Sequence, residues 1–441
     1  MKSVAFHTLG CKVNQVETEI IREDFVSRGY RLVDFNETAD IYIINTCTVT
    51  HISDRKSRAM IRRAVRNNPQ AIIVATGCLA QTDALQLAQI EGISLVVGNR
   101  EKGKIVDIIE HWETEQEQHP PKILVPPITA QDKPEAVDYF HLQQRARAFV
   151  KVQDGCQSFC SYCIVPYARG PVRSKLPDDV LREVRQLLTL GYREIVLTGI
   201  HTGMYGLDLD KVDLYQLICL LMEEIEGDYR VRLSSLEPLE VNEKLIELAA
   251  REERVCRHFH IPLQSGSNKI LSAMNRRYKR EYYRDLVRNI AATIPGVAIA
   301  ADIMVGFPGE EEKDFQDSYE LLESLPLCDL HVFKYSKRPG TPAALLQPEV
   351  SEQAKRVRSD KLLRLAKDKQ HRFLKSAAGQ ELKVVVERST GNDIYLGTSD
   401  NYLNVEFKTA ENLVGKFARV IIDGDDNGIA RGRILNGLTN P

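Results

Sequence analysis

The sequence contains no apolar run that approaches the roughly 18 residues needed to span a membrane. The apolar part of residues 1–15 is too short and too polar for a signal peptide. Net charge is also nearly absent, because 59 Lys and Arg face 61 Asp and Glu, so no global charge indicates a nucleic-acid partner. These absences predict a cytoplasmic protein without membrane contact.

A fourth ligand is missing beside three clustered cysteines, Cys156, Cys160 and Cys163. No Cys or His follows Cys163 within thirty residues. Structural zinc sites require four ligands, so this group leaves zinc one short. Iron–sulfur clusters are held by closely spaced thiolates, and a cubane on three thiolates keeps one iron open to a substrate or cofactor. The spacing favours iron–sulfur, with zinc as the alternative.

Three further cysteines each come just after a predicted strand: Cys11, Cys47 and Cys78. The carboxyl ends of neighbouring parallel strands lie at one edge of a sheet, so these thiols can meet there. A shared ligand explains them better than three small residues in separate tight turns. The other cysteines have no second ligand nearby and are expected to be ordinary buried or partly buried thiols: Cys219, Cys256 and Cys328.

The pattern of strands and helices predicts an α/β fold in three parts. Residues 1–115 predict a parallel sheet covered by helices. Residues 116–141, rich in Pro and Gln, predict a linker or a strap over a neighbouring surface. Residues 142–372 repeat strand and helix, as in a partial (β/α) barrel, and the short strands of 375–440 predict a small OB-like barrel.

Particular segments carry these predictions. Strands are expected at 2–10, 40–46, 71–77, 148–154, 194–200, 230–237, 258–264, 298–307, 329–336, 381–389, 393–400, 402–407, 415–425 and 428–435. Helices are expected at 14–29, 177–191, 213–227, 242–254, 267–277, 280–295, 312–325 and 351–375.

The C-x3-C-x2-C spacing after the first strand of a predicted barrel resembles the radical SAM enzymes. Tyr162, directly before Cys163, matches the aromatic position beside the adenine of S-adenosylmethionine in that superfamily. With TLGCKVNQVE, INTCTVT and TGCLAQ, the chain resembles the methylthiotransferases over nearly its whole length. That family joins an N-terminal cluster domain, a radical SAM core and a C-terminal TRAM domain.

The resemblance implies cofactors and partners. Two 4Fe-4S clusters are expected, one on Cys156, Cys160 and Cys163, and an auxiliary, sulfur-carrying cluster on Cys11, Cys47 and Cys78. One S-adenosylmethionine would methylate the sulfur, and a second would generate a 5′-deoxyadenosyl radical. The expected partners are tRNA, an electron donor such as flavodoxin or ferredoxin, and a sulfur source, with the chain acting as a monomer.

The loops TLGCKVNQ and LSSLEP are similar to the subgroup that methylthiolates carbon 2 of N(6)-threonylcarbamoyladenosine at tRNA position 37, beside the anticodon. The alternatives are the same chemistry on isopentenyladenosine of tRNA or on a ribosomal protein. A third alternative is a non-enzymatic, zinc-stabilised RNA-binding protein.

Residues at other strand ends are expected to contact S-adenosylmethionine or substrate: Thr198, Gly199, Glu237, Gln264, Gly306 and Phe307. The segment 197–203 lacks the acid of the Gly-Gly-Glu motif common in the superfamily. The competing interpretation is plain turn chemistry, since Gly and Pro end many strands.

Three basic runs, at 55–66, 274–281 and 351–375, predict a track for nucleic acid. Any one such run is more often a solvated face. From Ser376 onward, acids outnumber bases, so the small barrel would recognise RNA through a few side chains, such as Arg431 and Arg433, with bases stacked on Tyr395 or Tyr402. Alternatively, the preceding basic helix supplies the electrostatic attraction.

Overall fold

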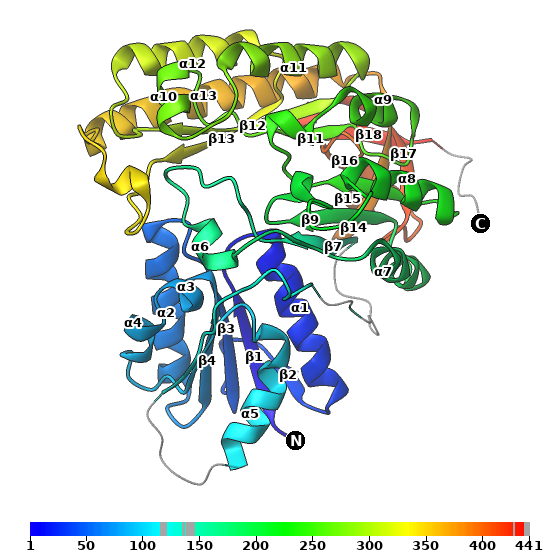
Figure 1. Ribbon diagram of the computed structural model, residues 1–441. Coiled ribbons are helices and arrows are strands. Elements are labelled where there is room, and N and C mark those ends of the chain that lie inside the picture. Colours follow the sequence, from blue (N-terminus) through cyan, green and yellow to red (C-terminus); the bar gives the residue numbers. More distant parts are fainter. Residues whose placement is uncertain (115–120, 135–136, 138–145, 427, 436–441) are drawn as a thin grey trace. The chain divides into compact units, whose positions relative to one another are not determined.

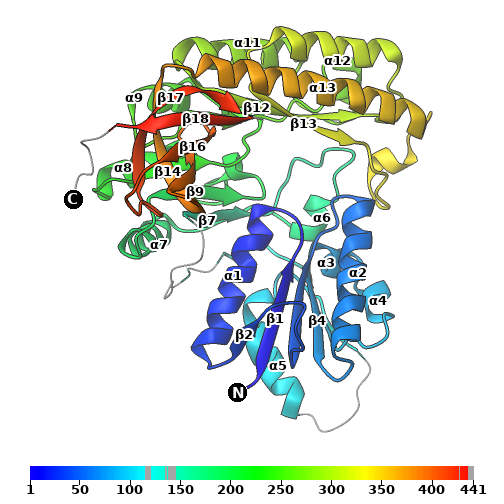
Figure 2. The same cartoon turned by 180° about the vertical axis from the view of Figure 1, so that it is seen from behind.

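The computed structural model describes residues 1–114, 121–134, 137, 146–426 and 428–435. The chain forms two compact units (Figures 1 and 2). The first unit consists of Met1–His141, Lys151–Lys175 and Ser336–Ala344, and the second of Leu142–Val150, Leu176–Tyr335 and Leu345–Pro441. Each unit is described by itself.

The first unit is built on a six-stranded parallel sheet in the order β2-β1-β3-β4-β5-β6. Its strands are β1 (Ser3–Thr8), β2 (Arg31–Val33), β3 (Ile41–Thr46), β4 (Ile72–Gly77), β5 (Leu95–Val97) and β6 (Lys122–Leu124). Both central strands, β3 and β4, are buried along their whole length, which explains their continuous apolar sequences. The predicted parallel sheet is confirmed.

Helices cover both faces of this sheet. On one face, α1 (Lys12–Ser27) and α5 (Ile105–Thr114) pack through residues such as Phe25 and Ile109. On the other, α2 (His51–Asn67), α3 (Cys78–Thr82) and α4 (Ala84–Ala88) pack through residues such as Ile61 and Leu87. This is a doubly wound arrangement, and the predicted covering of the sheet by helices is confirmed.

The segment predicted to be a linker contributes a strand. Lys122–Leu124 forms β6, parallel to β5 at the edge of the sheet. A three-residue strand is too short to show a period, and its neighbouring prolines indicated a loop. Residues 116–120, 135–136 and 138–141 of the predicted linker lie outside the described part of the chain.

A late segment of the chain, Ser336–Ala344, also belongs to the first unit. Arg338 donates a 2.7 Å hydrogen bond to the Thr48 hydroxyl and lies 2.8 Å from the Asp54 carboxylate. The Ala343 N–H donates to the Ser161 carbonyl at 2.8 Å. This segment therefore fastens the loops that follow β3 and β7.

The second unit contains the barrel strands β9 (Glu194–Gly199), β10 (Arg230–Leu233), β11 (His258–His260), β12 (Ala298–Val305) and β13 (Asp329–Lys334). The pairs β9–β10, β11–β12 and β12–β13 are parallel, and one bridge, Val231 to Val255, connects β10 with the approach to β11. The strand β7 (Arg147–Asp154) is divided between the two units: Arg147–Val150 belongs to the second unit, and the rest of the strand belongs to the first unit.

Helices alternate with these strands: α7 (Pro177–Thr189), α8 (Leu214–Glu224), α9 (Glu243–Arg251), α10 (Asn268–Ala273), α11 (Arg280–Thr293) and α12 (Glu312–Ser324). The long helix α13 (Glu352–Ser376) follows β13 after the segment Ser336–Ala344, which belongs to the first unit. Each of these segments was predicted to be helical, and the partial (β/α) barrel is confirmed.

A closed barrel follows α13, in the order β14-β15-β16-β18-β17. Its strands are β14 (Glu381–Gly391), β15 (Ile394–Ser399), β16 (Asn404–Lys408), β17 (Phe417–Asp426) and β18 (Ile429–Ile434). Val384, Val405, Phe407 and Val420 are among its core residues. The predicted small β-barrel is confirmed, while residues 427 and 436–440 of its predicted range lie outside the described chain.

A buried ion-pair group joins this barrel to the core within the second unit. Arg230 and Arg232 both bind the buried carboxylate of Glu194. Their remaining guanidinium N–H groups donate to carbonyls of the barrel, at Lys383, Thr398, Ser399 and Asp400.

No helix among the described residues is both long and apolar enough to cross a membrane.

Candidate active site

The first three cysteines lie at the carboxyl edge of the parallel sheet, as predicted. Cys11 caps α1 directly after β1, Cys47 follows β3, and Cys78 begins α3 after β4. These three strands are neighbours in the sheet. Because β2 lies on the opposite side of β1, the strand order reverses between β1 and β3, which is where open α/β sheets bind ligands.

Glycines let the cysteine loops approach closely. A Cβ on Gly10 would lie 3.0 Å from the Cys47 sulfur, and one on Gly77 would lie 2.4 Å from the Thr46 carbonyl oxygen. Burial raises the pKa of the Cys47 thiol, and the neighbouring Cys78 and Cys11 raise it further. The three thiols therefore interact with one another, and this donor set fits an iron–sulfur cluster with one open iron.

The second cysteine group lies on the loop between β7 and α6 (Val165–Arg169). The Cys156 N–H donates to the Gly170 carbonyl at 3.1 Å, and the Cys163 N–H to the Cys160 carbonyl at 2.9 Å. These bonds fold the loop into a compact turn. Tyr162 is half-buried within it, and all six cysteines belong to the first unit.

One buried arginine connects the two cysteine loops. The Nε–H of Arg169, at the end of α6, donates to the Cys78 sulfur at 3.2 Å. Its other N–H groups reach the Asn14 side chain and the Glu17 carboxylate on α1. Arg169 also lies 3.4 Å from Asp154, two residues before Cys156. The side chain is fully buried.

The charges around Arg169 do not cancel. Glu17 also binds Lys102 at 2.5 Å and Lys151 at 2.7 Å, and Asp154 binds Lys151 at 2.6 Å and lies 3.3 Å from Arg173. Burial opposes ionisation, but the cations outweigh it and hold the pKa of Glu17 well below its usual range and that of Asp154 at about 2. Four cations thus face two carboxylates, and the positive excess suits anionic thiolates.

Sequence reasoning did not find this ionic group. One signal was present: Glu17 and Asn14 lie on the buried stripe of α1 with Val13, Ile21 and Phe25. A charged residue on an apolar stripe is rarely buried without a partner. Its partner Arg169 is 152 residues away in sequence.

The other predicted contact residues all lie at the carboxyl ends of strands in the second unit. Thr198 and Gly199 end β9, Glu237 and Gln264 follow β10 and β11, and Gly306 and Phe307 follow β12. Their contact with cofactor or substrate stays a prediction.

Several of these groups already have partners within the chain. Glu237 forms an ion pair with Arg276, and the Gly306 N–H donates to the Glu310 carboxylate. The fully buried Phe307 ring packs edge-on against Tyr335. The main chain of Gln264 is bonded on both sides to β12.

The three basic runs differ in how many cations reach the surface. On α2, five are exposed: Arg55, Lys56, Arg62, Arg63 and Arg66. Arg58, Arg62 and Arg66 line a groove of about 520 Å³ beside α4. In 274–281, by contrast, Arg276 pairs with Glu237 and Arg280 with Asp317.

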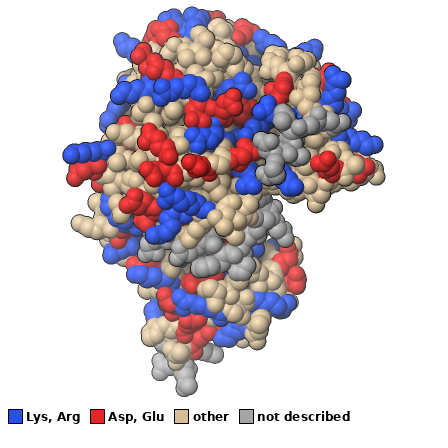
Figure 3. All heavy atoms as spheres, turned by 90° about the vertical axis from the view of Figure 1, so that its right-hand side faces the viewer, with Lys and Arg blue, Asp and Glu red and all other residues tan. Residues whose placement is uncertain are grey.

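Some of the basic side chains of α13 are buried and bind groups inside the protein instead of facing solvent. Lys355, Arg358 and Lys369 are buried, and Arg358 and Lys369 bind the Glu310 carboxylate and the Leu325 carbonyl. Charges of both signs are interspersed on the face in Figure 3. Lys355, Arg358 and Lys369 therefore cannot contribute to the predicted nucleic-acid track, and the part that α13 plays in it stays a prediction.

The small barrel also differs from the expectation. Tyr395 is buried in the barrel core and stacks on Phe407, so it is not available to a base. Tyr402 is partly exposed but stacks on His258. Arg431 and Arg433 pair with Asp426 and Asp423.

Comparison with known proteins identifies the chain. Residues 3–98 match "Uncharacterized protein family UPF0004", and residues 150–322 match the radical SAM superfamily. The chain is 40% identical to the threonylcarbamoyladenosine tRNA methylthiotransferase MtaB of Bacillus subtilis, over 96% of this chain and 94% of that protein. The chain belongs to the radical SAM methylthiotransferase family. Its cofactors are S-adenosylmethionine and 4Fe-4S clusters, which excludes the non-enzymatic zinc alternative.

Two further similarities bear on this radical SAM methylthiotransferase. It is 34% identical to the tRNA-2-methylthio-N(6)-dimethylallyladenosine synthase of Carboxydothermus hydrogenoformans, over 96% of each chain. Its fold resembles that of the radical S-adenosylmethionine methyltransferase TsrM from Kitasatospora setae, with a TM-score of 0.60, 14% identity, and coverage of 78% and 74% of the two chains. Among the remaining cysteines, burial raises the pKa of Cys256 and Cys328 to about 12, which keeps these two thiols protonated at neutral pH.

Proposed function

We propose that this enzyme methylthiolates carbon 2 of N(6)-threonylcarbamoyladenosine at position 37 of tRNA. The observation that carries the proposal is the 40% identity to the B. subtilis MtaB protein across nearly the full length of both chains. Identity to the dimethylallyladenosine enzyme is lower, at 34%. That enzyme's substrate is therefore the second candidate, and a ribosomal protein is the third.

In this proposal the two cysteine groups have different roles. Two S-adenosylmethionine molecules and two 4Fe-4S clusters supply a 5′-deoxyadenosyl radical and the inserted sulfur. Cys156, Cys160 and Cys163 hold the cluster that serves radical formation, with Tyr162 beside the adenine. Cys11, Cys47 and Cys78 hold the auxiliary cluster, and Arg169 supplies positive charge to its Cys78 ligand.

The exposed cations of α2 guide the tRNA backbone. α2 begins four residues after Cys47, so cations along this helix continue from a cysteine loop. An electron donor such as flavodoxin or ferredoxin, a sulfur source, a cytoplasmic location and a monomeric state complete the proposal.

Nucleoside mass spectrometry of total tRNA tests the substrate. Cells lacking the gene should lose the methylthio form of threonylcarbamoyladenosine and regain it on complementation. Loss of methylthio-isopentenyladenosine instead would keep the chemistry and replace the substrate. If no tRNA nucleoside changed, tRNA would be excluded, and ribosomal proteins would be analysed next.

Cysteine variants test the division of roles. Purified Cys47→Ala protein should retain S-adenosylmethionine cleavage and lose thiolation, whereas Cys160→Ala should lose both. Cys219→Ala, which changes a thiol outside both groups, is the matched control. Loss of cleavage in the Cys11, Cys47 and Cys78 variants alike would contradict the division.

A further inference from the structure

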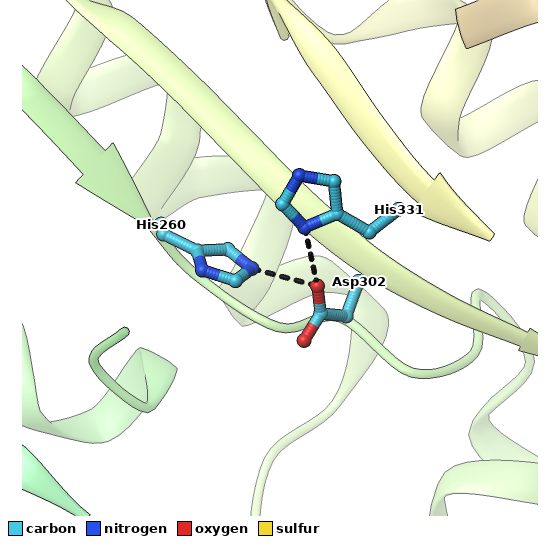
Figure 4. A group of neighbouring side chains, drawn as sticks. All are labelled: His260, Asp302 and His331. Atoms are coloured by element: carbon cyan, nitrogen blue, oxygen red, sulfur yellow. Dashed lines mark hydrogen bonds and ion pairs between the residues drawn. The ribbon is translucent and has the colours of Figure 1, made fainter. Parts of the chain in front are cut away.

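Three polar side chains of the second unit converge on one face of the sheet β11-β12-β13: His260, Asp302 and His331 (Figure 4). In the parallel register, Asp302 lies directly opposite His331 on β13. His260 on β11 lies opposite Ala300, two residues before Asp302. Paired residues, and residues two apart, point to the same side of a sheet. The strand register alone therefore places the three side chains together.

The cluster lies on the side of β12 opposite to three fully buried side chains. Alternate residues of β12, Ile299, Ala301 and Ile303, are fully buried on the opposite side. The three cluster side chains keep contact with solvent, because His260, Asp302 and His331 are 21%, 18% and 45% exposed. An ion from solution can therefore reach the cluster.

The donor atoms of the three residues converge on one point. Nε2 of His260 lies 2.6 Å, and Nδ1 of His331 lies 3.0 Å, from the same oxygen, Oδ1 of Asp302. All three donor atoms lie within 4.8 Å of one another. Metal–ligand bonds of about 2.0–2.2 Å place ligand atoms roughly 3 Å apart, so small side-chain rotations would suffice to admit an ion.

A carboxylate of β13, that of Asp329, lies near one of the two rings. This carboxylate lies 3.6 Å from Nε2 of His331, the ring nitrogen that faces away from Asp302. Histidines that bind metals commonly direct their other nitrogen to a carboxylate, which fixes the tautomer and the ring plane. Nδ1 of His331 faces Oδ1 of Asp302, on the side where the three donor atoms converge.

The donor set restricts the kind of ion. Two imidazole nitrogens and one carboxylate oxygen suit Zn²⁺, Fe²⁺ or Co²⁺ better than Ca²⁺ or Mg²⁺, which prefer oxygen ligands. No fourth His, Cys, Asp or Glu of the described chain joins the group. A bound ion would keep positions open for water or another small ligand, as in catalytic rather than structural sites.

We propose that His260, Asp302 and His331 bind a divalent first-row transition-metal ion, at a site that shares no residue with the six clustered cysteines. The competing arrangement is a carboxylate hydrogen-bonded to two imidazoles without an ion. Such a tie is not needed to align the strands, because β12 and β13 already pair over six consecutive residues.

Zinc binding to the anaerobically purified, cluster-loaded enzyme tests the proposal. Equilibrium dialysis with elemental analysis should give one zinc per chain with the iron content unchanged. X-ray absorption at the zinc edge should show a shell of nitrogen and oxygen at about 2.0–2.1 Å and no sulfur at about 2.3 Å. This spectrum is measured on the wild-type protein, so it does not depend on how a variant folds.

Variants locate the ion. His331→Gln and Asp302→Asn should each weaken zinc binding at least tenfold while retaining iron. His371→Gln is the control, because His371 is exposed on α13 and lies 4.0 Å from a single carboxylate, that of Asp425. A sulfur shell, no bound zinc, or equal binding by all variants would overturn the proposal and leave a hydrogen-bonded cluster only.

Discussion

At the scale of single residues, Arg169 is the side chain with the most consequences. It is fully buried, contacts Cys78, and belongs to an ionic group with more cations than carboxylates. Reduction of a cluster adds an electron, and a buried cation nearby stabilises the added negative charge. Arg169 should therefore raise the reduction potential of the cluster proposed at the first cysteine group.

We expect Arg169→Gln to lower that potential and Arg169→Lys to retain most of it. The measurement is a redox titration followed by electron paramagnetic resonance, after iron analysis has confirmed that the cluster is loaded. The same potential in the Gln variant and the wild type would show that Arg169 acts only as a packing residue.

Glu310 provides a test by pH. Burial raises its pKa to about 7, although Arg358 and the Gly306 N–H oppose the rise. The folded pKa lies above the ordinary value of 4.5, so the folded state binds this proton more tightly than the unfolded state. The contribution of Glu310 to stability therefore falls as pH rises from about 4.5 to about 7, by roughly 3 kcal/mol in all.

Glu310→Gln should remove this slope, because the amide can still accept the Gly306 N–H but does not ionise. Urea unfolding at several pH values between 5 and 8 gives the free energies. Glu311→Gln, at the exposed neighbouring position, should keep the wild-type slope. If the Glu310→Gln variant kept the wild-type slope as well, the pH dependence would belong to another group.

At the scale of elements, the sequence predicted the strands and helices with a clear period. β3 and β4 are continuous apolar runs, and α7 to α12 have amphipathic patterns. The strands β2, β5 and β6 were not predicted, because three residues carry no period and their strand character comes from pairing in the sheet. The grouping of Cys11, Cys47 and Cys78 at one edge of the sheet was predictable, because the ends of the strands that precede them were predictable.

Charge on a helix was harder to interpret than its period. Sequence gives the number of cations on α13, but only packing shows that Lys355, Arg358 and Lys369 are buried. Arg276 and its partner Glu237 are 39 residues apart in the sequence, so a local sequence pattern could not predict their ion pair either.

α2 is consequently the helix on which the tRNA proposal depends most. Arg62 and Arg66, four residues apart on one face, line the groove beside α4. The double variant Arg62→Glu/Arg66→Glu should weaken tRNA binding at least tenfold and flatten its salt dependence, because fewer phosphates are neutralised. Filter binding at several salt concentrations measures both effects.

Arg288→Glu is a control for charge reversal, since Arg288 is exposed on α11 outside the three basic runs. Unchanged affinity and salt slope in the α2 variant would remove this helix from the tRNA path.

At the scale of the whole molecule, the second unit should unfold cooperatively. Glu194 has a pKa of about 2, because Arg230 and Arg232 outweigh the effect of burial. The same arginines bind carbonyls of the small barrel. The group therefore couples β9 and β10 to β14 and β15.

Arg232→Met should destabilise the second unit by about 3–5 kcal/mol, the usual effect of removing one partner from a buried ion pair. Hydrogen exchange followed by mass spectrometry should show β9 and β15 losing protection by the same factor. Faster exchange in the barrel alone would mean that the barrel opens independently of the core.

The discontinuity of the first unit has a consequence for the order of synthesis. Its parallel sheet is formed by the first 124 residues, but the loops that carry cysteines are held in place by contacts with Ser336–Ala344. A growing chain cannot complete this unit until residue 344 of 441 has left the ribosome. The iron–sulfur clusters should therefore be assembled on this unit only late in translation or after the chain is released. A truncated protein that ends after the first sheet would contain the cysteines Cys11, Cys47 and Cys78 but would lack the contacts made by Ser336–Ala344.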